Sequence, residues 1–298
     1  MRKLAPWMVL LAAVLWGSNG IFVNLLADSG FSAIERTSVR MFLAVFMEAV
    51  ILFLSDRKSF RIDRKGLLWS LFIGVFGMYL FLVLYTSAIA RVGMGTAGVL
   101  IYLMPGLVTA YSCLFKGERF TSLKGIALAL NLLGCALVSG IMNGAGNNLT
   151  GILCGIAAAF FYAFNNIAVA HGLKGCSPAT KMFYPALFAG MSAFVYLCMF
   201  SDIGGIVSRL MTDPKLIFFI ALWALCCSIL TYYLFNTALS YLNIVTASML
   251  STFEPVAAVL FGVILFHERQ GLFGWIGVIL VIASLILIEF KPEGGKNE

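Results

Sequence analysis

Ten apolar segments, each close to the length of a membrane span, follow one another along this 298-residue chain. A helix of about 20 apolar residues crosses the hydrocarbon core of a bilayer. Hydrophobic residues make up 61% of the chain and charged residues 11%, against about 45–50% and about 25% in soluble domains. The sequence therefore predicts an all-α integral membrane protein in the lipid bilayer, with ten transmembrane helices at residues 5–27, 37–54, 67–88, 94–115, 124–142, 151–170, 182–200, 216–239, 244–266 and 272–290.

The distribution of positive charge predicts the orientation of these spans. Most of the 20 Lys and Arg residues fall in the two termini and the even-numbered connections. Positive residues accumulate in cytoplasmic loops, so both termini are expected in the cytoplasm of a multi-pass protein of the cell (inner) membrane. The same rule accounts for the net charge of +7, and without a nucleic-acid-binding motif we expect no nucleic-acid partner.

Two proline-centred segments show that the chain contains an internal repeat. The segment TAGVLIYLMPGLVTAYSCLFKGER ends at Arg119, and TASMLSTFEPVAAVLFGVILFHER ends at Arg269. Pro105 aligns with Pro255, Thr96 with Thr246, and Glu118-Arg119 with Glu268-Arg269. A proline inside a helix removes a backbone hydrogen bond and bends it, so paired helix kinks are expected at Pro105 and Pro255.

A second pair of segments extends the repeat to the whole chain. LWGSNGI at 15–21 resembles FYAFNNI at 161–167, so Trp16 aligns with Tyr162 and Asn19 with Asn165. Each half holds five spans, and an odd number makes the second half enter the membrane from the opposite side. We expect two inverted five-helix repeats at 1–142 and 151–290, a linker loop at 143–150 and a cytoplasmic tail at 291–298.

These segments resemble the EamA-type ten-span permeases of the drug/metabolite transporter superfamily. The resemblance rests on LWGSNG, VRMFLA, YTSAIARVGMGTAGVLIYLMPGLVTAYSCLFKGER and STFEPVAAVLFGVILFHERQ. It implies a secondary active transporter, often an exporter, of small metabolites such as amino acids. It further implies that spans one to four and six to nine surround a central cavity, with spans five and ten at the periphery. Inverted repeats suit alternating access around one fixed site.

Glu254, beside Pro255 in the middle of span nine, is the main candidate for a functional residue. A carboxylate at that depth costs about 2.5–3.5 kcal/mol on insertion scales. We interpret it as a cavity residue that takes up a coupling proton or binds a cationic group of the cargo. The alternative is that it accepts hydrogen bonds from backbone groups left free beside the proline.

Further candidates come from aromatic and amide side chains in the repeated segments. Such side chains suit recognition of a small polar or zwitterionic molecule with an apolar part. Hydrogen bonding between helices in lipid is the structural alternative. With Glu254, the candidate substrate-binding residues are Trp16, Asn19, Tyr79, Tyr102, Tyr162, Asn165 and Ser251.

Two charged residues of span two receive a structural interpretation. Arg40 is expected near the outer surface, where its side chain reaches toward water, and Glu48 deeper, with a structural ion pair favoured over gating. The sequence then shows no basic residue in mid-membrane, which favours neutral, zwitterionic or cationic cargo. The alternative within the superfamily, a sugar-phosphate or nucleotide-sugar exchanger, calls for Lys or Arg deep in the cavity.

Other classes of function find little support. The sequence has no GxSxG, HExxH or GxxxxGK[ST] motif, so we expect neither an enzyme nor a cofactor. The less favoured alternatives are an intramembrane enzyme and a channel. The seven scattered cysteines have no CxxC spacing, and HERQG at 267–271 lacks the second histidine of a zinc site, so no metal is expected. The protein is expected as a monomer or homodimer.

Overall fold

The structure is a computed structural model and describes residues 2–55, 57–138, 148–267 and 271–289. Within these ranges all regular secondary structure is helical. Eight helical segments are long and apolar enough to cross a membrane, and α7 and α15, which are shorter, occupy the places of the expected fifth and tenth spans. The prediction of an all-α protein with ten spans is confirmed. Most of the expected linker and the whole expected tail lie outside the described residues.

Several spans are built from more than one helical segment. Two of these segments are π-helices, which carry an extra residue per hydrogen-bonded turn. In chain order the main helices are α1 (Ala5–Gly17), α2 (Asn19–Leu25), α3 (Ala33–Ser55), α4 (Arg64–Phe72), π-helix η4 (Ile73–Leu80), α5 (Phe81–Ile101), α6 (Met104–Lys116), α7 (Ser122–Val138), α8 (Leu149–Gly172), α9 (Pro178–Phe200), α10 (Ile203–Thr212), α11 (Pro214–Ala224), π-helix η6 (Leu225–Leu230), α12 (Thr231–Ala238), α13 (Ile244–Ser251), α14 (Glu254–Phe266) and α15 (Leu272–Glu289).

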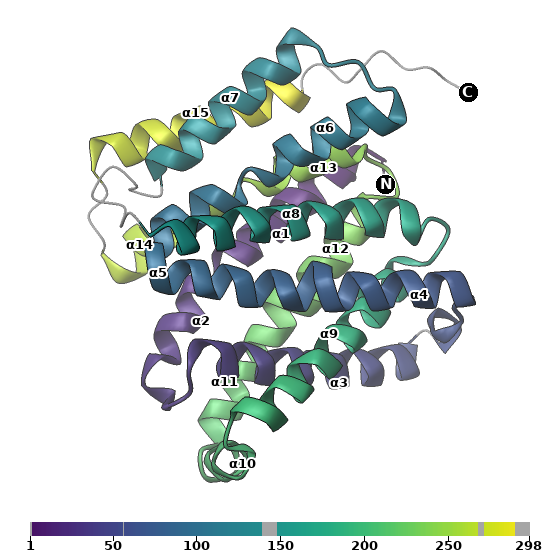
Figure 1. Ribbon diagram of the computed structural model, residues 1–298, viewed down its shortest axis with the longest axis vertical. Helices are drawn as coiled ribbons and strands as arrows, with labels where there is room; N and C mark the ends of the chain where they lie inside the picture. The colour runs from purple at the N-terminus through teal and green to yellow at the C-terminus, as the bar shows by residue number, and fades with distance from the viewer. Residues whose placement is uncertain (1, 56, 139–147, 268–270, 290–298) are drawn as a thin grey trace.

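The two halves of the chain interleave in space. Helix α8 of the second half packs along α5 of the first, α9 packs along α3, and α1 lies against α12 and α14 (Figure 1). Helices α7 and α15 pair with each other at one end of the molecule (Figure 1), and their inner faces pack against α1 and α13. This arrangement leaves the remaining spans of both halves to enclose the interior.

Irregular backbone recurs at equivalent places in the two halves. The π-helix η4 lies in span three, and η6 lies in span eight. Spans four and nine are interrupted at residues 102–103 and 252–253 and end in left-handed residues, Gly117 (φ 67°) and His267 (φ 53°). In these two pairs of spans the repeat preserves irregular backbone as well as helices.

The paired prolines sit just after the two interruptions. Pro105 is the second residue of α6, and Pro255 is the second residue of α14. The first-turn N–H groups of a helix have no partner within it, so a proline there removes no hydrogen bond. Each of these spans is therefore two helices divided before the proline, where the sequence suggested one helix bent at it.

Helices α7 and α15 approach so closely that glycine is required at the contact. A Cβ placed on Gly277 would lie 2.6 Å from the carbonyl oxygen of Gly134 and 2.7 Å from the amide nitrogen of Val138. Both neighbours are backbone atoms, so they cannot rotate away.

We expect Gly277→Leu to separate α7 from α15 and lower the free energy of unfolding by about 1–3 kcal/mol, as overpacking of a tight contact does. Thermal denaturation of the purified protein in detergent measures the change. Gly106→Leu is the control, because a Cβ at Gly106 meets no atom within 4 Å. Equal stability of the two variants would contradict the close contact.

Candidate functional site

A cavity of about 350 Å³ lies between the two halves. Its lining comes from α1, α2, α3, η4 and α5 in the first half and from α8, α9, α11, η6, α12 and α14 in the second. Pockets for small molecules typically hold about 300–1,000 Å³. The cavity therefore has the size of a site for a small organic molecule and is shared by both repeats.

The cavity reaches toward one side of the molecule. Its lining includes Val23 near the end of α2 and Ala33 at the start of α3, which flank the connection at residues 26–32. We call this the mouth side. The opposite side, which carries the connections at 57–63, 117–121, 173–177 and 239–243, is called the closed side.

A break in span one builds the polar part of the cavity. The helix is interrupted at Ser18, and the side-chain amide of Asn19 donates a hydrogen bond to the carbonyl of Trp16 (2.7 Å). The Oδ1 atom of Asn19 accepts hydrogen bonds from Arg40 Nη1 (3.0 Å) and Trp223 Nε1 (2.7 Å). The Arg40 guanidinium lies over the Trp223 ring, 4.3 Å from its centroid. Asn19 thus joins three spans at one point of the wall.

The structure corrects the interpretation of Arg40. The residue lines the cavity instead of reaching toward an outer surface, and no carboxylate lies within 4 Å of it in the part of the chain that the structure describes. Helix α3 begins at Ala33, four residues before the expected start of span two, so Arg40 lies two turns inside the helix. The expected absence of basic residues in mid-membrane is therefore wrong, and the structural ion pairs expected for Arg40 and for Glu48 are not found among the described residues.

Two carboxyl groups share the cavity with Arg40. Glu48 on α3 is only 1% exposed, and its Oε2 atom has no hydrogen-bond partner among the described residues. Glu254 is the first residue of α14 and lines the cavity as expected from its position. Its side chain has no hydrogen bond to a backbone donor in the described ranges, and the unpaired N–H groups at the start of α14 favour negative charge there.

Four of the eight expected substrate-binding residues line this cavity, namely Trp16, Asn19, Tyr162 and Glu254. The other four do not. Tyr102 packs with Trp16 and Phe235 in the core, and the Ser251 hydroxyl donates to the carbonyl of Ser248 (2.8 Å).

The remaining two expected residues miss the cavity because of local backbone structure. Tyr79 lies in the π-helix η4 and faces Tyr196, with ring centroids 6.4 Å apart. Asn165 packs near Gly77, because α8 is continuous where span one is broken. Breaks and π-helices change which side of a helix faces inward, so alignment of the repeats does not carry Asn19's position over to Asn165.

Sequence reasoning missed several cavity residues. Tyr85 on α5 and Tyr232 on α12 lie on spans that carry a π-helix, and Trp223 comes from α11. Each is one aromatic residue among 41 in the chain, so no pattern in the sequence separates them from packing residues. The described residues contain no group of three His, Cys, Asp or Glu side chains that could hold a metal ion.

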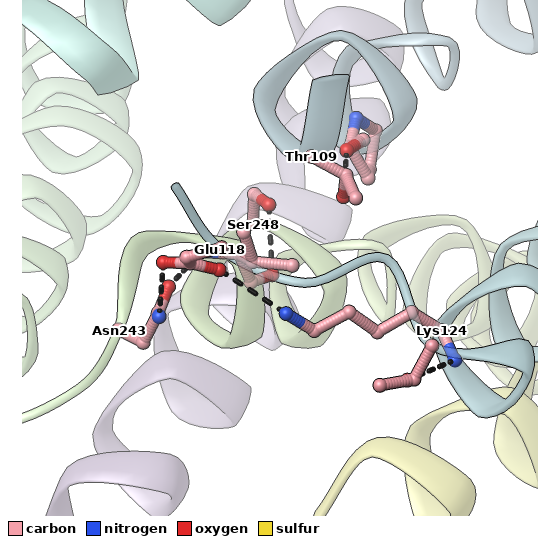
Figure 2. A network of polar contacts seen from close by, with 8 residues as sticks. Thr109, Glu118, Lys124, Asn243 and Ser248 are labelled. Carbon is pink, nitrogen blue, oxygen red and sulfur yellow. Dashed lines mark hydrogen bonds and ion pairs between the residues drawn. The ribbon is translucent and has the colours of Figure 1, made fainter. Parts of the chain in front are cut away.

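Polar contacts between the halves cross the closed side. Glu118, which follows α6, accepts a hydrogen bond from Asn243 Nδ2 at Oε1 (2.7 Å) and pairs with Lys124 Nζ at Oε2 (3.1 Å), as Figure 2 shows. Asn243 also caps α13 through Val245 N (2.8 Å). We call Glu118, Lys124 and Asn243 the closed-side clasp. The matching Glu268-Arg269 lies outside the described residues.

A second set of contacts joins the halves on the same side. Ser59 and Ser177 are hydrogen-bonded through their hydroxyls (2.8 Å), and Tyr184 donates to the carbonyl of Phe60 (2.8 Å). A small cavity of about 10 Å³, room for about one water, adjoins the large cavity at Met78, Met182 and Tyr232 and is lined in part by Asn165, Lys181 and Asn236. This side of the molecule is therefore closed by contacts between the repeats, which include these polar contacts and apolar packing such as that of Phe60 against Phe183.

Comparison with known proteins identifies the family. The EamA-like transporter family matches residues 3–140 and, a second time, residues 149–290. The chain belongs to the EamA-like transporter family. This protein is thus a multi-pass membrane transporter of the drug/metabolite type, built from two copies of the EamA unit.

The names of individual relatives agree with the assignment to this family. The chain is 26% identical to an uncharacterized inner membrane transporter, YicL, of Salmonella typhimurium, over 96% of this chain and 95% of that protein. It is 24% identical to an uncharacterized transporter, YxxF, of Bacillus subtilis, over 99% and 93%. It is 25% identical to the pseudopaline exporter CntI of Pseudomonas aeruginosa, over 53% and 55%.

A solved structure shares the fold. This crystal structure, whose name states no function, matches with a TM-score of 0.81 and 15% identity, over 97% of this chain and 98% of that one. At this identity the likeness shows the fold alone.

Proposed function

We propose that this protein exports small organic metabolites, such as amino acids or related compounds, across the inner membrane by alternating access. The observation that carries the proposal is the cavity shared by both repeats and sealed on one side by contacts between them. Exchange of conformation between inverted repeats would seal the mouth side and open the closed side around the same site. The exporter CntI, a relative over about half the chain, supports the direction of transport.

We further propose that the closed side faces the cytoplasm. Most basic residues of the chain lie at the termini and at connections on the closed side, as the positive-inside rule requires of cytoplasmic segments. The structure would then represent the protein open to the outside. In this proposal the protein acts as a monomer or homodimer. It needs no enzymatic activity, because alternating access moves the cargo without any chemical step.

Proton coupling is assigned to Glu254 in this proposal. Glu254 lies where span nine is divided and shares the cavity wall with Tyr85, Tyr162 and Tyr232. No cationic group of the described residues lies within 4 Å of its carboxyl group. A carboxyl group without an ionic partner in such a site can gain and lose a proton as its access to water changes. Binding or release of that proton can then be linked to binding of the cargo.

Arg40 favours the alternative of a sugar-phosphate or nucleotide-sugar exchanger, because that function calls for a basic residue deep in the cavity. The same cavity nevertheless holds Glu48 and Glu254. Two carboxylates repel a doubly charged phosphate, so export of a phosphate ester is the second candidate.

Counterflow in proteoliposomes tests the proposal. Purified protein is reconstituted with an internal pool of unlabelled neutral amino acids, and uptake of each labelled amino acid is measured with and without a proton gradient. We expect exchange of at least one of them above protein-free liposomes and accumulation that depends on the gradient. Exchange of sugar phosphates alone would favour the second candidate, and steady ionic current would indicate a channel.

The closed-side clasp supplies a separate prediction. Glu118→Ala removes the hydrogen bond from Asn243 to the Glu118 carboxylate, which crosses between the repeats and is worth about 1–2 kcal/mol, so opening of the closed side should rise roughly five- to thirtyfold. The measurement is labelling of Asn236→Cys, which lines the small cavity, by a membrane-impermeant maleimide in a background without other reactive cysteines. Lys116→Gln, at an exposed position of α6, is the control. Unchanged labelling in Glu118→Ala would show that the clasp does not hold the closed side.

A further inference from the structure

We propose that Arg40 binds a carboxylate group of the cargo, held for this role by Asn19 and Trp223. The inference rests on the proposed transport function and narrows its substrate class to compounds with a single carboxylate. The subsite lies in the wall of the cavity where spans one, two and eight meet.

The hydrogen bonds of Arg40 are incomplete without a ligand. A guanidinium has five N–H donors, and the described residues provide one hydrogen bond, from Nη1 to Asn19 Oδ1 (3.0 Å). The Nε atom is buried without a partner in the described ranges. A buried charge without a counter-ion is costly, whereas a guanidinium and a carboxylate form short paired hydrogen bonds.

The surroundings of Arg40 hold the group without neutralising it. Trp223 covers one face of the guanidinium at 4.3 Å, and Asn19 holds one edge. A guanidinium stacked on an aromatic ring keeps its in-plane N–H groups available for a carboxylate. Asn19 Oδ1 also accepts from Trp223 Nε1 (2.7 Å), so the ring and the guanidinium are oriented by one atom.

A contrast with Arg36 shows that this arrangement is not general for cavity arginines. Arg36 also lines the cavity, but its Nη1 donates to the carbonyls of Leu26 (2.7 Å) and Val23 (3.4 Å), which tie α3 to the end of span one. Arg36 therefore stabilises the connection at the mouth side. Arg40 has no such backbone acceptors among the described residues and directs its charge into the cavity.

The two carboxyl groups of the cavity disfavour a second negative charge on the anion, since Arg36 donates to backbone carbonyls at the mouth side and Arg40 is left to bind the ligand. Glu48 lies two turns along the same helix from Arg40, and Glu254 lies across the cavity on α14. All three line the same cavity as Tyr232. A molecule that places a carboxylate at Arg40 and a cationic group toward a glutamate matches both signs, which a phosphate ester does not.

Thermal stabilisation of the purified protein in lipid nanodiscs tests the subsite directly. The probes are the neutral amino acids and, for each, the carboxamide in which the carboxylate is replaced by an uncharged amide. We expect stabilisation by at least one free acid, with the matching carboxamide binding roughly 10- to 100-fold more weakly, the usual loss for a hydrogen bond to a charged group. Equal binding of acid and carboxamide, or no binding by any acid, would overturn the proposal.

Variants separate binding from folding. Arg40→Gln should remove the preference for the acid, and Arg40→Lys should keep part of it because a lysine retains the charge but not the planar fork. Asn19→Asp loses the hydrogen bond to the Trp16 carbonyl but places a carboxylate beside Arg40, so the folded fraction of this variant should fail to bind the acid. Arg91→Gln, an equal change of charge at an exposed position outside the cavity, should bind like the wild type. Retention of the preference in Arg40→Gln would rule Arg40 out.

Counterflow of the same compounds distinguishes this inference from the proposed function. Acids that bind through Arg40 without being exchanged would support the subsite and contradict transport. Exchange of carboxamides as fast as acids would support transport and contradict the subsite. Absence of both binding and exchange for all these compounds would contradict both.

Discussion

Glu254→Gln should uncouple transport from the proton gradient. Glutamine has nearly the same shape as glutamate but cannot take up a proton, so the cavity and its closure should be retained while the link to protons is lost. Coupling between two sites is typically worth about 1–3 kcal/mol, so accumulation driven by an imposed proton gradient should fall roughly 5- to 150-fold. Uptake into proteoliposomes with an acid or neutral exterior measures it.

The controls for this variant separate coupling from folding and from charge. Counterflow, which needs no gradient, should continue in Glu254→Gln. Asp28→Asn, at an exposed position of the connection between α2 and α3, should keep gradient-driven uptake. Glu48→Gln tests the second carboxyl of the cavity, and loss of coupling in that variant alone would assign the proton to Glu48. Full coupling in Glu254→Gln would remove Glu254 from the mechanism.

Gly17→Leu should unfold or inactivate the protein, because Gly17 lies at a close contact between α1 and α14. A Cβ at this position would lie 2.7 Å from Ala257 Cβ, 2.8 Å from the carbonyl oxygen of Glu254 and 2.9 Å from the amide nitrogen of Ala258. We expect the free energy of unfolding to fall by about 3 kcal/mol, at the upper end for overpacking. The variant should also displace Glu254 and the break at Ser18, so counterflow should be lost in any protein that folds.

A graded series tests the contact at Gly17. Gly17→Ala should have a smaller effect than Gly17→Leu, because one methyl group needs a smaller displacement of α14. Gly98→Ala and Gly98→Leu, in α5, are the matched controls, since a Cβ at Gly98 meets no atom within 4 Å. Melting temperatures in detergent and counterflow rates are the two measurements. Wild-type values for Gly17→Leu would show that α1 and α14 can move apart freely.

The candidate site was only partly predictable from the sequence. Glu254, Trp16, Asn19 and Tyr162 stand out as polar or aromatic residues in repeated segments, and all four line the cavity. Arg40 was misplaced because hydropathy set the start of its span four residues late.

The sequence by itself determined the class of fold. Its apolar segments require a lipid environment, and their number and the spacing of Pro105 and Pro255 indicate two repeats. The segments that contain these prolines also indicate the family. All these features depend only on composition and on order along the chain. The tertiary structure decided which side chains meet. The break at Ser18, the divided spans at 102–103 and 252–253, and the π-helices η4 and η6 each rotate the following turns. Only the packing of the two halves shows which faces then point into the cavity, because a rotation of a helix leaves its sequence pattern unchanged.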